Sequence, residues 1–64
     1  MTLKDYYAKV SKEERLKIRQ LLCAAMGIEY YQFDYRRRTG KWSYAEKSVG
    51  MQALNKNGYE NIEI

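Results

Sequence analysis

The sequence predicts an all-α domain, a small bundle of about four helices, and three observations favour it. Three segments open with a serine or threonine followed three residues later by an acid, the pattern of a helix-capping box. The longest, residues 12–26, repeats apolar residues every three or four positions. The chain has no proline, and three of its 4 glycines stand where helices would end. Residues 30–45 are the one segment whose pattern also fits a β-hairpin.

A chain of 64 residues forms one domain, because a core of this size cannot be divided. We expect residues 1–58 to form it and residues 59–64 to be a C-terminal tail. The single cysteine, Cys23, has no disulfide partner, and without histidine the chain offers no zinc site. We therefore predict no metal and no cofactor. Neither a signal peptide nor an apolar run long enough for a membrane is present, which favours the cytoplasm.

The charge of the chain is moderately basic. Lys and Arg number 12 against 8 acids, so the net charge is +4 and the isoelectric point is near 9.3. Four basic residues and one acid fall within residues 30–41, a local charge of +3. This concentration favours a polyanionic partner over a membrane or a small-molecule substrate.

The first two helices are predicted from their caps. Thr2 and Asp5 indicate a short helix at about residues 3–9, with Leu3, one of the two following tyrosines and Val10 turned inward. Ser11 precedes a longer helix that ends at Gly27. Five apolar residues of that helix share one face: Ile18, Leu21, Leu22, Ala25 and Met26.

Residues 30–45 fit two structures. With a period of two, an aromatic face runs through a β-hairpin whose turn is "RRTGK": Tyr31, Phe33, Tyr35, Trp42 and Tyr44. With a period of 3.6, an apolar stripe is only partly defined by Ile28, Tyr31, Phe33 and Tyr35, and "RRR" closes a short helix before Gly40. Periodicity alone slightly favours the hairpin, which would make the fold α+β.

Ser43 and Glu46 then open a last helix that ends before Gly58. Gly50 inside it costs about 1 kcal/mol relative to alanine. The tail "YENIEI" fits an extended arm, a short edge strand or a frayed end.

The order of these parts resembles the small repressor, Cro-like helix-turn-helix DNA-binding proteins of bacterial phages and mobile elements. In that pattern a glycine ends the first helix of the motif, and Gly27 stands there. Ile28 matches the apolar residue after it, Phe33 the anchor six positions on, and Cys23 the small residue four before. Arg36 departs from a usually apolar position, and Gly40 lies one residue late. The resemblance favours the helix over the hairpin.

The resemblance implies sequence-specific binding of double-stranded DNA by a transcriptional regulator, with homodimers on a two-fold operator. The recognition helix would supply five residues to the major groove: Tyr30, Tyr31, Gln32, Asp34 and Tyr35. Gln32 is the main candidate for reading a base, because an amide can pair with adenine. Four basic residues would contact phosphates: Arg36, Arg37, Arg38 and Lys41.

Other functions are less favoured. No motif supports an enzyme, and Cys23 has no histidine to activate it. The alternative class is a protein-interaction module that uses the aromatic face of the hairpin. Binding of single-stranded nucleic acid through exposed tyrosines and arginines is a third interpretation.

Overall fold

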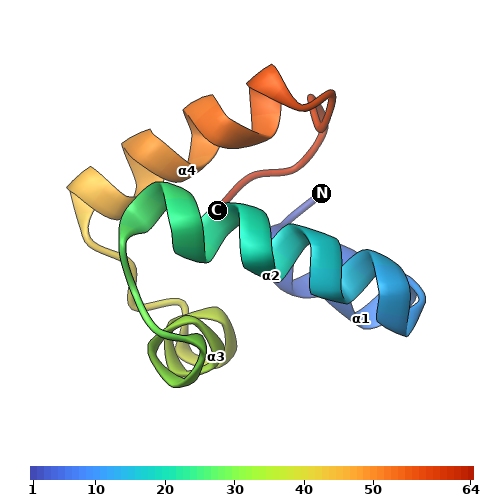
Figure 1. Ribbon diagram of the computed structural model, residues 1–64, viewed down its shortest axis with the longest axis horizontal. Helices are drawn as coiled ribbons and strands as arrows, with labels where there is room; N and C mark the ends of the chain where they lie inside the picture. Colours follow the sequence, from blue (N-terminus) through green and yellow to red (C-terminus); the bar gives the residue numbers. More distant parts are fainter.

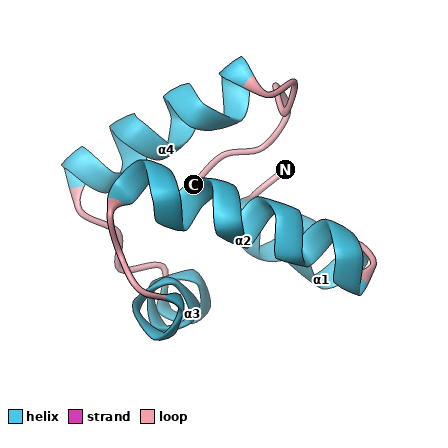
Figure 2. Ribbon diagram, viewed as in Figure 1, coloured by secondary structure: helices cyan, strands magenta, loops and turns pink.

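Four helices follow one another along the chain in the computed structural model, which describes residues 1–64. They are α1 (Leu3–Lys9), α2 (Lys12–Met26), α3 (Tyr30–Thr39) and α4 (Tyr44–Lys56) (Figure 1). The chain forms no strand beyond one isolated bridge between Thr2 and Glu63 (Figure 2). The predicted all-α bundle is confirmed, and the alternative hairpin at residues 30–45 is wrong.

The helix starts are set by local hydrogen bonds, as the sequence predicts. Side-chain oxygens of Thr2, Ser11 and Ser43 each accept a hydrogen bond from the amide three residues later, at 3.1–3.2 Å. These amides would otherwise lack partners, because a helix leaves its first N–H groups free. At the last cap the bond is reciprocal, since Glu46 Oε1 accepts from the Ser43 amide at 2.9 Å.

Tertiary packing explains why residues 30–39 form a helix. A strand would place Tyr31, Phe33 and Tyr35 on one face. In α3, however, Phe33 is 0 % exposed, whereas Tyr31 and Tyr35 are 73 % and 50 % exposed. The Phe33 ring lies 5.9 Å from that of Tyr7 and 5.8 Å from that of Trp42. The core thus takes one aromatic side chain from this helix and leaves the others in solvent.

Helix α2 lies at the centre of the fold. It packs against both α3 and α4, and α1 also contacts α3 (Figure 1). The buried core draws on every helix and on the tail: Leu3, Tyr7, Ile18, Leu22, Cys23, Phe33, Leu54 and Ile62. Within the predicted inner face of α2, Ala25 is instead exposed. The buried residues of α2 are Ile18, Leu22 and Cys23, while Leu21 and Met26 are only half-buried.

Gly50 lies at a close approach between α4, α2 and the C-terminus. A Cβ atom added there would stand 2.3 Å from Ile64 Cδ1 and 2.6 Å from Met26 Cε. Two side-chain ends would therefore have to move to admit even alanine. Both atoms are the far ends of flexible side chains, which can move aside at low cost.

The tail, residues 59–64, pairs with the N-terminus and completes the core. The Leu3 amide donates to the Glu63 carbonyl at 2.7 Å, and the Glu63 amide donates to the Met1 carbonyl at 2.8 Å. Ile62 is only 4 % exposed. Of the three predicted forms, the tail adopts an extended segment beside the start of the chain.

A tyrosine–carboxylate cluster joins the tail to α2. The Tyr59 hydroxyl donates to Glu14 Oε1 at 2.5 Å, and the Tyr6 hydroxyl donates to the same oxygen at 3.3 Å. The two rings meet edge to face, with centroids 6.1 Å apart. The hydrogen bond to Glu14, together with burial, raises the pKa of Tyr59 to about 12 from its ordinary 10.0.

Replacing Tyr59 by phenylalanine is expected to lower the free energy of unfolding by about 1.5–3 kcal/mol, as for a hydrogen bond to a charged group. Because the folded pKa is raised, the bond stabilises fully below pH 10 and is lost as the pH rises towards 12. Urea denaturation of both proteins should show a constant difference up to about pH 9 and a shrinking one above. A difference that does not change with pH would contradict this role of the hydroxyl.

Candidate nucleic-acid interface

Helices α2 and α3 are joined in the manner of a helix-turn-helix unit. Residues 27–29 form the turn, and Gly27 adopts the left-handed conformation, with φ 69°. The amides of Gly27 and Ile28 both donate to the Cys23 carbonyl, at 2.9 and 3.2 Å. Figure 1 shows α3 end-on while α2 runs across the view, so the two helices cross steeply. A steep crossing over a short glycine turn is typical of this motif.

Three side chains form the outer face of α3. Tyr31, Tyr35 and Arg38 follow one another at the i, i+4, i+7 spacing that places residues on one side of a helix. All three are exposed, and no hydrogen bond or ion pair engages their side chains. The outer face is therefore free to contact a partner.

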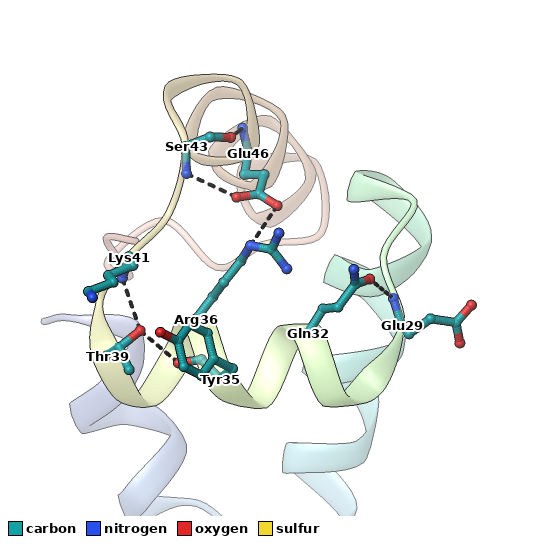
Figure 3. Close-up of polar contacts among 8 residues, drawn as sticks. All are labelled: Glu29, Gln32, Tyr35, Arg36, Thr39, Lys41, Ser43 and Glu46. Atoms are coloured by element: carbon teal, nitrogen blue, oxygen red, sulfur yellow. Dashed lines mark hydrogen bonds and ion pairs between the residues drawn. The ribbon is translucent and has the colours of Figure 1, made fainter.

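The start of α3 is more constrained than the sequence indicates. Gln32 Oε1 accepts a hydrogen bond from the Glu29 amide at 2.9 Å, so this side chain caps its own helix (Figure 3). A bidentate bond to adenine uses both the oxygen and the nitrogen of an amide. Gln32 can make that contact only by releasing the cap.

Tyr30 is 46 % exposed and lies against α2. The Arg19 guanidinium carbon stands 4.5 Å from the centroid of its ring. A cation over an aromatic face is attracted by the ring quadrupole, so this contact holds Tyr30 to one side of the outer face.

Arg36 points to α4. Its Nε lies 3.0 Å from Glu46 Oε2, and both side chains are largely buried (Figure 3). Glu46 thus caps α4 with one oxygen and pairs with α3 through the other. This ion pair ties α3 to α4.

Arg37 points to α1. Its guanidinium carbon stands 4.4 Å from the Tyr7 ring centroid, and an Nη2 lies 3.7 Å from Asp34 Oδ1. The Arg37 side chain is only 19 % exposed. Arg37 and Asp34 are therefore engaged with the protein itself.

The C-terminal end of α3 carries the two basic side chains that stay free. Arg38 and Lys41 are exposed and form no ion pair. Gly40, with φ 72°, ends the helix between them, and the Lys41 amide donates to Thr39 Oγ1 at 3.4 Å. Of the nine predicted residues, four have exposed side chains that no hydrogen bond or ion pair engages: Tyr31, Tyr35, Arg38 and Lys41. The first three share the outer face of α3, and Lys41 follows the end of that helix.

A second group of basic residues, which is absent from the predicted site, lies on α2. Lys12, Arg15 and Arg19 recur at helical spacing, and that spacing is a signal that the sequence does contain. Arg15 Nε donates to the Tyr7 carbonyl at 2.8 Å, and its Nη2 donates to the Ala8 carbonyl at 3.2 Å. Arg15 therefore satisfies carbonyls at the end of α1 and places its guanidinium carbon 5.7 Å from the centroid of the Tyr7 ring.

Cys23 lies on the buried side of α2, in the core. Burial raises the pKa of its thiol, which keeps the sulfur protonated at neutral pH. The thiolate is the reactive form of cysteine, so this side chain acts as a small apolar residue.

No helix has both the length and the apolar composition needed to cross a membrane.

Comparison of the chain with protein-family models, with curated proteins and with solved structures finds no match.

Proposed function

We propose that this protein binds double-stranded DNA in a sequence-specific manner, without catalysis, as a transcriptional regulator of a phage or mobile element. The observation that carries the proposal is the outer face of α3: two exposed tyrosines and one unpaired arginine in a row on the second of two helices that a glycine turn joins. A helix of this kind fits the major groove, which is about 12 Å wide.

The side chains of the outer face suit contacts with DNA. A tyrosine ring packs against a thymine methyl group, and its hydroxyl bonds to a base edge or a phosphate oxygen. Arg38 pairs with guanine or with phosphate, and Lys41 adds a second cation at the same end of the helix. Base contacts would come from the tyrosines, and orientation from the cations.

The supports behind α3 suit the same role. Phe33 anchors the helix in the core, and the Arg36–Glu46 pair ties it to α4. Side chains presented on a rigid helix lose little conformational freedom on binding, which favours affinity. One copy offers few contacts, so we propose that a homodimer binds two half-sites of an operator.

The aromatic hairpin face on which the protein-interaction alternative depends does not exist. Phe33 is 0 % exposed on the inner side of α3, while Tyr31 is 73 % exposed on the outer side. Trp42 packs against Phe33 and Tyr44 stands on another helix. These aromatic residues therefore do not share one docking surface.

Replacing Arg38 by alanine is expected to weaken binding to every duplex and to lower the salt dependence of the affinity by about one unit of slope. Fewer counterions are released when one phosphate contact is removed. Fluorescence anisotropy of a labelled duplex, measured at several salt concentrations, gives both quantities. The control is Lys56→Ala, an exposed lysine in the last turn of α4.

The same titration tests the proposal as a whole. Salt-sensitive binding of the unmodified protein to duplex DNA, stronger than to a single strand of equal length, is expected. Equal affinity for both forms, or no binding at low salt, would contradict it.

A further inference from the structure

A basic hollow lies on the surface where the first half of α2 passes α1. Its volume is about 350 Å³, and it is lined by Tyr7, Lys12, Arg15, Leu16 and Arg19. Three of these five side chains are cationic and none is acidic. Neither of the two ion pairs in the protein involves them. The hollow therefore collects positive charge that the protein does not neutralise.

Internal contacts hold two of the three cations in place. Arg15 donates from Nε and Nη2 to carbonyls at the end of α1, which leaves three of the five guanidinium N–H donors without a protein partner. Arg19 stacks on the Tyr30 ring and makes no hydrogen bond, and its Nε is buried without an acceptor. Both arginines are thus positioned in advance, with donors to spare.

The cationic side chains of the hollow offer hydrogen-bond donors, and the hollow holds no acidic acceptor for them. Like charges repel when they are gathered, and an oxyanion in the hollow would offset that repulsion. The Arg19 Nε is closed to solvent, so the anion would accept from the free N–H donors of Arg15 and from the ammonium group of Lys12. A phosphate group is the best match, because its several oxygens accept from guanidinium forks and from an ammonium group together.

We propose that the basic hollow is a phosphate-binding site formed by Lys12, Arg15 and Arg19. The phosphate belongs either to a nucleic-acid strand or to a free phosphorylated molecule. The hollow adjoins the start of α3 through the Arg19–Tyr30 contact, while Arg38 and Lys41 lie at the other end of that helix. Assigning the phosphate to DNA rests on the proposed function, whereas the site itself does not.

The test is a titration of the full chain with sodium pyrophosphate at constant ionic strength, followed by NMR of the arginine Nε–H groups. We expect saturable shifts at Arg15 and Arg19, and an affinity about tenfold lower in Arg19→Gln, which removes a charged fork. Lys56→Gln, on α4, should bind like the unmodified protein. Shifts that never saturate, or that are the same in Arg19→Gln, would overturn the site.

A second variant, Lys12→Gln, distinguishes a loss of pyrophosphate binding from a loss of the fold. Arg19→Gln loses the contact with Tyr30, whereas Lys12 is exposed and forms no ion pair within the protein. Thermal denaturation of both variants reports whether the fold is kept. Weaker pyrophosphate binding by folded Lys12→Gln supports the site, and unchanged binding in both variants refutes it.

A parallel titration with duplex DNA separates the two sources of phosphate. If Arg19→Gln lowers the DNA affinity and its salt slope along with pyrophosphate affinity, the site holds a strand. If only pyrophosphate affinity falls, the site takes a free phosphorylated molecule. If the unmodified protein binds pyrophosphate but no DNA, the proposed function fails and the phosphate site stands.

Discussion

Replacing Phe33 by alanine is expected to cost about 3–5 kcal/mol of unfolding free energy, as for a fully buried aromatic residue. Phe33 is 0 % exposed and contacts Tyr7 of α1 and Trp42 before α4. It joins three parts of a core that contains only eight buried apolar residues. Since small domains hold only about 5–15 kcal/mol in total, this change should leave the protein barely folded.

Urea denaturation followed by circular dichroism measures this loss. Tyr31→Ala is the matched control, because it removes an aromatic residue two positions earlier on the same helix but from the solvent side. A change at such a surface site is expected to stay within about 0.5 kcal/mol. Similar losses in the two variants would show that α3 does not bury Phe33 and expose Tyr31.

Replacing Tyr31 and Tyr35 together by alanine is expected to lower the affinity for a specific duplex by about 100-fold, with little change in stability. The estimate takes each tyrosine as worth about 1–2 kcal/mol, near the low end of base contacts. Both side chains stand free on the outer face of α3, so their removal leaves no buried group without a partner.

A duplex selected from random sequence by the unmodified protein provides the ligand, and anisotropy provides the affinity. Tyr44→Ala is the control, since Tyr44 is 88 % exposed but lies at the start of α4. Binding to random duplex should fall less than binding to the selected one, because phosphate contacts persist. A double variant that keeps both affinities would exclude the outer face of α3 as the DNA surface.

Phe33 lies on the buried side of α3, and Tyr31 and Tyr35 lie on its exposed side. The sequence pattern does not predict this division. The spacing of Tyr31, Phe33 and Tyr35 also fits a strand, so local pattern does not decide between the two structures. The resemblance to helix-turn-helix proteins favoured the helix, and the burial of Phe33 explains it. Which tyrosines remain free depends on the neighbours that cover the other side.

The three consecutive arginines of α3 are a second feature that the sequence pattern does not resolve. Arg36, Arg37 and Arg38 are adjacent and chemically identical, so the sequence cannot rank them. In the structure the first pairs with Glu46, the second lies over Tyr7 and only the third is free. Their partners come from α4 and α1, and adjacent helical positions point about 100° apart, so each arginine meets a different surrounding.

Interactions between near neighbours therefore settle where the helices begin and end, and they are visible in the sequence because a cap involves residues three apart. Thr2, Ser11, Ser43, Gly27 and Gly40 all occupy the predicted positions. Contacts between distant segments settle the rest: the outer face of α3, the basic hollow and the docking of the tail. These depend on which helix surfaces meet, and the free energy of that packing belongs to pairs of segments rather than to any one of them.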